Sequence, residues 1–298
     1  MQLSRHGVRM SKEILLSVLM PVHNAEHTVM RAAKSTLKAM PPNSELLVQL
    51  DGCSDGSLEL LSSIQDDRLK ISASKENIGV SATLNALLAR ASGQYVARMD
   101  ADDVCLQNRF KNQLSRIQSL KSDLLFGKAI LWNPKKLLPF IPAPTPSLSR
   151  QELDMALIRS NPLVHPTLLA TKASLSSLGG YRQSAAEDYD LWLRARTLGF
   201  QIDRLNTFLI LYRVHESQLT KQIEWQRNLN EDQALIQSLD DFGRIVLSLS
   251  SDIKPTLRGT SNALWEQVIA KFRPSFLLKW KLIGVKATLK TLVRGKQD

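Results

Sequence analysis

The 298-residue chain contains few cysteines, few aromatic residues and no long apolar run. Its two cysteines, Cys53 and Cys105, provide no disulfide framework and fit a reducing compartment. No run of about 18 apolar residues occurs, so we expect no transmembrane helix. The first apolar run, residues 14–20, precedes Pro21 and not a small-residue cleavage site, which indicates a strand and not a signal peptide. Aromatic residues make up 6% of the chain and are not interleaved with basic clusters, so we expect no nucleic-acid partner.

Acidic residues are also scarce, with 28 Asp and Glu against 39 Lys and Arg and a net charge of +11. A basic protein favours anionic partners such as nucleotides, anionic lipid surfaces or nucleic acid, and the charge alone does not choose among them. The hydrophobic content of 43% is enough to bury the core of one large domain or two small ones. Because acids are few, the places where they cluster are informative.

From residue 14 to 103 the chain alternates between β-prone runs and amphipathic helical runs. Strands are expected at 15–20, 45–50, 68–73 and 94–99, and helices at 26–39, 55–64 and 79–91. We expect Leu58 to face inward from the second of these helices. Short strand–helix connections of this kind are typical of βαβ units. The pattern predicts an α/β protein with a Rossmann-type mixed sheet, mostly parallel and flanked by helices.

After residue 103 the pattern is less regular. Helices are expected at 104–119, 151–159 and 187–198, extended segments at 123–132, 161–171 and 207–214, and a proline-containing surface loop at 133–149. The last of these helices has an apolar side that includes Trp192 and Leu198. Beyond residue 216 the chain is expected to be mainly helical. We therefore divide it into a flexible leader at 1–13, a domain at 14–217 and a helical C-terminal extension at 218–298.

Three carboxylates, those of Asp100, Asp102 and Asp103, follow the strand predicted at 94–99. Carboxylates at the end of a buried strand are costly unless a cation binds them. Mg²⁺ and Mn²⁺ prefer oxygen ligands and usually combine one or two protein carboxylates with phosphate and water. The alternative is that Asp102 or Asp103 only caps a helix that begins near Val104.

Polar residues also follow the other three predicted strands. They are Pro21, His23 and Asn24 after the first strand, Asp51 after the second, and Asn77 and Gly79 after the third. The carboxyl ends of parallel strands meet at one edge, where such sheets bind ligands, so we expect one shared site. Asp51 could accept hydrogen bonds from a base or ribose, and the helix that begins at Gly79 offers free N–H groups to an anion. Ordinary turns would explain each segment separately.

Glu187 and Asp188 lie at the start of the helix predicted at 187–198. Acids in a first helical turn are common because of the helix dipole, and the functional alternative is a general base that deprotonates a substrate hydroxyl. Near the end of the strand at 207–214, Arg213 could pair with a phosphate and His215 could ligate a metal. The sequence leaves these alternatives open, as it does for a structural or functional role of His165.

Taken in order, these segments resemble family 2 glycosyltransferases of the GT-A fold. The resemblance rests on Pro21–Asn24, Asp51–Gly52, Asn77–Gly79, Asp100–Asp103, His165–Pro166, Gly179–Tyr181, Glu187–Asp188 and Tyr212–His215. It covers roughly residues 14–217, about two-thirds of the chain. It implies a nucleotide-sugar half at 14–103 and an acceptor half at 104–217.

The resemblance implies an inverting transferase that moves a sugar from a UDP-, GDP- or TDP-sugar to a hydroxyl of a saccharide or lipid-linked acceptor, with Mn²⁺ or Mg²⁺. Asp188 would be the catalytic base, and Asp102 and His215 would bind the metal, with Asp100-Ala101-Asp102 as the DXD motif. The donor would be bound by Pro21, His23, Asn24, Asp51, Asn77, Gly79, Asp100 and Arg213. His165, Glu187 and Trp192 would lie on the acceptor side. The family often has two acids where this chain has Leu50 and Asp51, which leaves the base selectivity open.

Two alternative functions remain at this point, a sugar-nucleotide nucleotidyltransferase and a non-catalytic protein that binds nucleotide sugars. The C-terminal segment 275–294 forms a basic amphipathic pattern, which favours packing on the protein or contact with anionic lipid. We therefore expect a cytoplasmic enzyme of surface polysaccharide or glycolipid synthesis, with peripheral contact at the inner face of the membrane as the second alternative for this segment.

Overall fold

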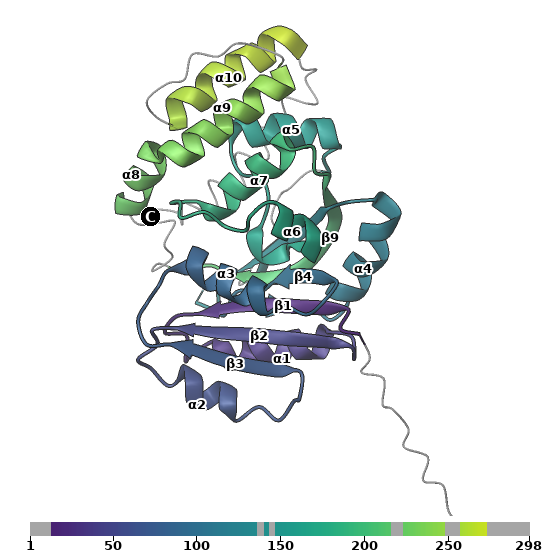
Figure 1. The fold of residues 1–298 in the computed structure, drawn as a ribbon, viewed down its shortest axis with the longest axis vertical. Coiled ribbons are helices and arrows are strands. Elements are labelled where there is room, and N and C mark those ends of the chain that lie inside the picture. The colour runs from purple at the N-terminus through teal and green to yellow at the C-terminus, as the bar shows by residue number, and fades with distance from the viewer. Residues whose placement is uncertain (1–12, 136–139, 143–146, 216–222, 248–256, 273–298) are drawn as a thin grey trace, which may run out of the picture.

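The computed structural model describes residues 13–135, 140–142, 147–215, 223–247 and 257–272. Within these ranges the chain forms one nine-stranded mixed sheet flanked by helices, with a group of helices stacked beyond one end of it (Figure 1). Residues 1–12 of the leader expected at 1–13, and the amphipathic segment 275–294, lie outside the described residues. Among the helices that are described, none has the length and apolarity that a membrane span requires.

The sheet brings the carboxyl ends of its main strands to one edge. The strands are β1 (Leu16–Val22), β2 (Ser44–Asp51), β3 (Leu69–Ser74), β4 (Tyr95–Arg98), β5 (Val104–Cys105), β6 (Leu124–Trp132), β7 (Phe140–Pro142), β8 (Leu169–Thr171) and β9 (Ile202–Arg213). Their order is β3-β2-β1-β4-β8-β6-β9-β5, and β7 pairs with β6. Strands β1 to β4 are parallel, and β8 is antiparallel to both β4 and β6. Strand β6 therefore runs parallel to β4, and β9 runs parallel to β6.

Helices cover the sheet and extend it at one end (Figure 1). They are α1 (Val29–Ala39), α2 (Ser57–Ser62), α3 (Val80–Arg90), α4 (Arg109–Leu120), α5 (Arg150–Arg159), α6 (Lys172–Ser177), α7 (Glu187–Thr197), α8 (Ile223–Glu231), α9 (Gln233–Leu247) and α10 (Leu257–Phe272), with a 3₁₀ turn at His165–Thr167. Helix α9 packs on α7, and α10 packs on α9 and α5.

The hydrophobic core consists of two clusters that share the central strands. Strand β1 alternates between them, with Val18 and Met20 in one cluster and Leu19 in the other. A strand that is buried on both faces reads as a continuous apolar run, which is why residues 14–20 could be recognised as a strand. The second cluster continues through Trp192 of α7 to Leu239 of α9, so the C-terminal helices share a core with the second half of the sheet.

The segment after the acidic cluster differs from its prediction. Val104 and Cys105 form β5 and pair with Leu211 and Ile210 of β9, and α4 begins only at Arg109, with Asn108 as its N-cap residue. Neither Asp102 nor Asp103 caps a helix near Val104, and that alternative was wrong. The antiparallel pairing with β9 overrides the local helical pattern there and draws the end of β9 toward the acids.

Three smaller predictions are also corrected. Leu58 is 48% exposed on the outer side of the short helix α2, and Leu198 is 65% exposed because α7 ends at Thr197. The proline-containing loop at 133–149 includes a short strand, β7. The helix α6 at 172–177, which packs near β8, had no predicted counterpart.

Candidate active site

Asp100, Asp102 and Asp103 lie in the turn that follows β4, and one carboxylate oxygen from each falls within 4.8 Å of the others. Asp103 is 1% exposed; its Oδ1 accepts a hydrogen bond of 2.8 Å from the Arg213 backbone N–H. Its Oδ2 has no hydrogen-bond partner among the described residues. Burial, with added repulsion from Asp102 and Asp100, raises the pKa of Asp103 well above its usual range. A hard divalent cation would satisfy this unpaired oxygen, so the donor set fits such an ion.

The end of β9 lies beside the acidic cluster, as expected from the sequence. His215 Nε2 is 3.1 Å from Asp102 Oδ2, and both side chains are about one-quarter exposed. Because β5 pairs with β9, the turn that carries Asp102 and the end of β9 are fixed to each other. Asp102, Arg213 and His215 therefore lie together at the carboxyl edge of the sheet.

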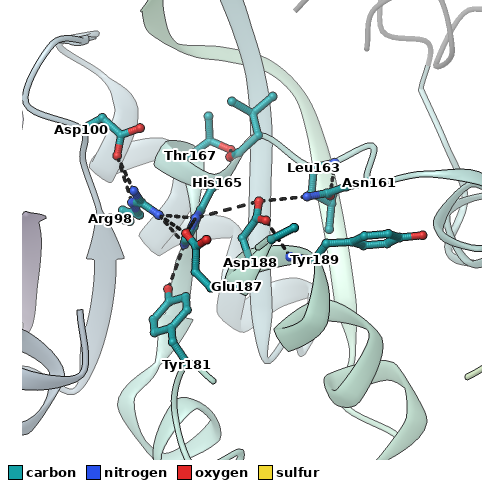
Figure 2. Close-up of polar contacts among 12 residues, drawn as sticks. Arg98, Asp100, Asn161, Leu163, His165, Thr167, Tyr181, Glu187, Asp188 and Tyr189 are labelled. Carbon is teal, nitrogen blue, oxygen red and sulfur yellow. Dashed lines mark hydrogen bonds and ion pairs between the residues drawn. The ribbon is translucent and has the colours of Figure 1, made fainter. Parts of the chain in front are cut away.

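The buried guanidinium of Arg98 connects the acidic cluster to a second group of titratable residues (Figure 2). Arg98 is 7% exposed, and its Nε donates to Asp100 Oδ1 at 2.9 Å. Its Nη1 contacts both ring nitrogens of His165 and lies 3.6 Å from Glu187 Oε1. Although burial lowers the pKa of Arg98, the charges of Asp100 and Glu187 raise it above its usual value. The last residue of β4 is thus a permanent cation between two sets of acids.

His165, in the 3₁₀ turn, is the centre of the second group. Its Nε2 lies 3.0 Å from the Tyr181 hydroxyl, and its Nδ1 lies 3.5 Å from Glu187 Oε1. Burial and the neighbouring Arg98 charge lower the pKa of His165 to about 4. The imidazole is therefore neutral at neutral pH. Trp192 is fully buried, and its ring meets His165 edge-on at 5.4 Å. This corrects the expectation for Trp192, which supports His165 from the core and has no surface for an acceptor to contact.

Glu187 and Asp188, adjacent in the first turn of α7, have different electrostatic environments (Figure 2). Burial raises the pKa of Glu187, but a hydrogen bond from His165 and the charge of Arg98 outweigh it, and the net shift is downward. Burial, followed by repulsion from Glu187, raises the pKa of Asp188 to about 7. Its Oδ2 accepts from Asn161 Nδ2 at 2.9 Å and its Oδ1 from the Tyr189 backbone N–H at 2.7 Å. Two neighbouring carboxylates with separated pKa values are suited to different roles, and Asp188 is the one suited to move protons near pH 7.

The residues predicted at the donor end lie around the carboxyl ends of β1 and β2. The Asp51 carboxylate accepts from the backbone N–H groups of Ile78 at 2.7 Å and Gly79 at 3.0 Å. It therefore holds the loop 77–79 at the end of its own strand. Gly52, with a φ of +58°, permits this approach, because a Cβ there would lie 2.5 Å from the Asn77 backbone nitrogen. Asp51 shapes the edge of the site, and its contact with a base stays a prediction.

The remaining donor-side residues extend the same edge at the end of β1. His23 Nδ1 lies 2.6 Å from the Asp51 carbonyl oxygen, and Asn77 Nδ2 lies 3.4 Å from the same ring nitrogen. Asn24 has a φ of 45° and accepts from the Ser54 backbone N–H at 2.9 Å, which joins the loops after β1 and β2. Pro21 is half-buried within β1. Because β1 lies between β2 and β4, this group and the acidic cluster occupy neighbouring strand ends.

Sequence reasoning missed three residues of the site. Arg98 lies in the strand predicted at 94–99 and was given no role, although an arginine inside an apolar strand was the signal for one. Tyr181 entered only as part of a segment that carries the family resemblance, and Asn161 only as the first residue of the extended segment expected at 161–171. Their contacts with His165 and Asp188 join residues far apart in the chain, and no local pattern announces such contacts.

Comparison with known proteins supplies the family. The model of Glycosyl transferase family 2 matches residues 17–153, which include the donor-side residues and the acidic cluster. A UDP-Glc:alpha-D-GlcNAc-diphosphoundecaprenol beta-1,3-glucosyltransferase of Escherichia coli, WfgD, is 27% identical over 61% of this chain and 69% of its own. Residues 17–153 belong to glycosyl transferase family 2. Glu187, Asp188, Arg213 and His215 lie beyond the matched residues.

Solved structures show the same fold. The crystal structure of S. aureus TarS 1–349 in complex with UDP-GlcNAc superimposes with a TM-score of 0.60 at 17% identity, covering 93% of this chain and 81% of that one. The mannosyltransferase PcManGT from Pyrobaculum calidifontis, in complex with GDP-Man and Mn²⁺, gives a TM-score of 0.56 at 15% identity, covering 95% and 76%. The predicted fold class, a mostly parallel mixed sheet of the GT-A type flanked by helices, is confirmed.

Proposed function

We propose that this glycosyltransferase moves a sugar from a nucleotide-diphospho-sugar to an acceptor hydroxyl with inversion at the anomeric carbon, and that Asp188 is the catalytic base. One observation carries the proposal. Two adjacent acids, Glu187 and Asp188, have opposite pKa shifts, and Arg98 links Glu187 directly to Asp100 of the acidic cluster. A base with a pKa of about 7 beside a carboxylate cluster suits deprotonation of a hydroxyl next to a bound diphosphate.

The donor is proposed to bind along the ends of β1, β2 and β4. The ordered loop 77–79 presents the N-terminal end of α3, where free backbone N–H groups and the helix dipole favour an anion. Pro21, His23, Asn24 and Asp51 would line the nucleoside end of the same edge. TarS binds UDP-GlcNAc and PcManGT binds GDP-Man, which supports a nucleotide sugar without choosing the base for this chain. UDP-, GDP- and TDP-sugars therefore remain the candidate donors.

Mn²⁺ or Mg²⁺ is the proposed cofactor, and Asp102 its main ligand, with Asp100, Asp103 and His215 beside it. The convergence of three carboxylates, one of them with an unpartnered buried oxygen, supports this choice, and PcManGT is described in complex with Mn²⁺. When bound, such a cation supplies Lewis-acid stabilisation of the charge that develops on the leaving diphosphate. Arg213, at the end of β9, would pair with the same phosphates.

The chain's own residues account for the proton transfer. Asn161 and the Tyr189 backbone N–H each donate to one oxygen of Asp188, which fixes the plane of the carboxylate. Asp188 would accept the acceptor's hydroxyl proton while that oxygen attacks the anomeric carbon opposite the leaving diphosphate. A single displacement of this kind inverts the stereocentre and needs no covalent sugar–enzyme intermediate, unlike retaining glycosidases. His165, neutral and buried, would hold Glu187 and Arg98 in place at the acceptor side.

The acceptor is proposed to be a saccharide or a lipid-linked saccharide of surface polysaccharide or glycolipid synthesis. WfgD acts on a GlcNAc-diphosphoundecaprenol acceptor, which supports this class. We also propose that residues 14–217 form the catalytic part and 218–298 a helical extension. The enzyme would act in the cytoplasm, and contact of segment 275–294 with the inner face of the membrane stays part of the proposal.

A donor screen tests the function. UDP-, GDP- and TDP-sugars are incubated with Mn²⁺ or Mg²⁺ and saccharide or polyprenyl-diphosphate-linked acceptors, and the released nucleotide and the anomeric configuration of the product are measured. We expect a nucleoside diphosphate and an inverted product. Release of pyrophosphate would identify a nucleotidyltransferase instead, and binding of nucleotide without release from any donor would identify a non-catalytic binding protein.

A further inference from the structure

Helix α9 contacts the catalytic segment on both sides of Glu187 and Asp188. Before them, Asp232 Oδ2 accepts from the Ser184 hydroxyl at 2.7 Å and from the Ala185 backbone N–H at 2.8 Å. After them, the Ser238 hydroxyl of α9 donates to Asp190 Oδ1 at 2.7 Å. The two contacts therefore lie on either side of Glu187 and Asp188 in the sequence, at the start of α7 where the proposed base lies.

Asp232 connects α9 to the segment that leads into α7, because each of its two carboxylate oxygens accepts hydrogen bonds from a different one of these elements. Its Oδ1 accepts from the Leu235 backbone N–H at 3.0 Å, which caps the N-terminus of α9. The other oxygen holds the loop 184–185 that leads into α7. The carboxylate is thus fixed to α9 and orients the entry to α7, and an acid at this helix end is also favoured by the helix dipole.

Ser238 donates its hydrogen bond to the buried carboxylate of Asp190. Asp190 is 0% exposed, and its Oδ2 accepts from Arg194 Nε at 2.8 Å. Arg194 in turn donates to the carbonyl oxygens of Leu178 at 2.7 Å and Gly180 at 2.8 Å. These carbonyls belong to the turn that precedes Tyr181, whose hydroxyl meets His165. Ser238 is therefore connected through Asp190 and Arg194 to the turn 178–180, and the next residue of the chain, Tyr181, contacts His165.

Apolar packing keeps the two helices in register. Leu235 and Leu239 of α9 are fully buried and share a cluster with Tyr189 and Leu193 of α7. The buried hydrogen bond between Ser238 and Asp190 favours a single register of α9 on α7, because a shift of α9 would remove this donor from Asp190 Oδ1. The seam joins the base-bearing helix to a part of the chain that lies beyond the family match at residues 17–153.

We propose that Asp232 and Ser238 are positioning residues of the transfer reaction, and that α9 completes the active site by fixing the first turn of α7. The inference rests on the proposed role of Asp188 as the base. Neither residue touches substrate. Both act by holding Asp188 at the distance and angle that a proton transfer requires, and displacements of about 1 Å in such geometry can cost about a hundredfold in rate.

The test compares Asp232→Ala and Ser238→Ala with wild type in the full chain. We expect kcat to fall about tenfold or more while KM and Kd for the donor stay within about twofold, because the donor edge is built from other strands. Ser238→Thr, which keeps the hydroxyl, should restore kcat. Gln237→Ala is the matched control, since Gln237 is exposed on α9 and bonds only within the helix to Asp241 among the described residues.

A double variant separates a positioning role from general destabilisation. If Asp232 acts through Asp188, adding Asp232→Ala to Asp188→Asn should lower the residual rate no further, whereas independent effects would multiply. Should Asp232→Ala fail to fold, the Ser238→Ala and Ser238→Thr pair decides the question. Unchanged kcat in Ser238→Ala, or an equal loss of kcat and donor affinity that Ser238→Thr does not restore, would overturn the inference. Absence of transfer by wild type would instead defeat the proposed function itself.

Discussion

Replacement of Glu187 by glutamine is expected to move the acid limb of the kcat/KM pH profile to lower pH. In wild type this limb should follow Asp188, whose pKa is raised to about 7, so kcat/KM should fall as pH drops through 7 and the base becomes protonated. The charge of Glu187 is the second cause of that raised pKa, after burial. Its removal stabilises the ionised form of Asp188 and lowers the pKa.

The size of the shift follows from the geometry. Glu187 Oε1 and Asp188 Oδ2 lie 3.5 and 3.9 Å from the same atom, Nδ1 of His165. The two oxygens are therefore at most about 7 Å apart, where two unit charges repel by about 2 kcal/mol at an effective dielectric constant of about 20. This repulsion corresponds to a downward shift of roughly one to two pKa units. The amide of the variant can still hydrogen-bond His165.

Initial-rate assays of nucleoside diphosphate release, at donor concentrations below KM, measure the acid limb of the profile. The assays cover about pH 5 to pH 9, roughly the range in which a base with a pKa near 7 titrates. Asp66→Asn is the control, because it makes the same chemical change in a carboxylate that pairs with Arg68 beside β3. A limb that stays in place or moves to higher pH in Glu187→Gln would refute the assignment of the limb to Asp188 and its coupling to Glu187.

Three further predictions concern the metal, the core and the donor edge. Asp102→Ala should abolish Mn²⁺-dependent nucleotide binding in isothermal titration calorimetry, and undiminished affinity would remove it as the main ligand. Trp192→Ala should lower the free energy of unfolding by about 3–5 kcal/mol, because the buried ring packs 4.8 Å from Phe126. Trp192→Phe should cost less in the same denaturation experiment, since the indole nitrogen has no partner among the described residues. Gly52→Ala should weaken donor binding, because Gly52 has a positive φ and an added Cβ would clash with the backbone of Asn77. An unchanged donor Kd would show that the loop adapts to the added methyl group.

The first half of the fold was predictable because its signals are local. Strands β1, β2 and β4 contain short apolar runs, β3 alternates apolar and polar residues, and α1 and α3 are amphipathic, so hydrophobic periodicity and turn residues suffice to place these elements within a few residues. The parallel arrangement then follows from the alternation, and with it the shared edge for the polar strand ends. This is why the sequence alone predicts that Asp51, Asn77 and Asp102 lie at one edge of the sheet.

The second half depends on pairing between distant segments, which no local pattern reports. Val104 and Cys105 look like the start of a helix and become a strand because β9, more than 100 residues later in the chain, pairs with them. Trp192 was correctly placed on the apolar side of its helix, but the acceptor side and the core cannot be told apart from periodicity alone. The position of Arg98 at the centre of the site is evident only from its contacts with His165 and Glu187, which are distant in the sequence.

The most direct test of the account is donor binding and single-turnover transfer by Asp188→Asn, measured on the same preparation. The amide keeps the shape of the side chain but cannot accept the hydroxyl proton. The account predicts donor affinity close to that of wild type and transfer slowed by about 10²- to 10⁴-fold. Transfer within a few-fold of the wild-type rate would contradict the account, because the proton would then be leaving the acceptor by another route.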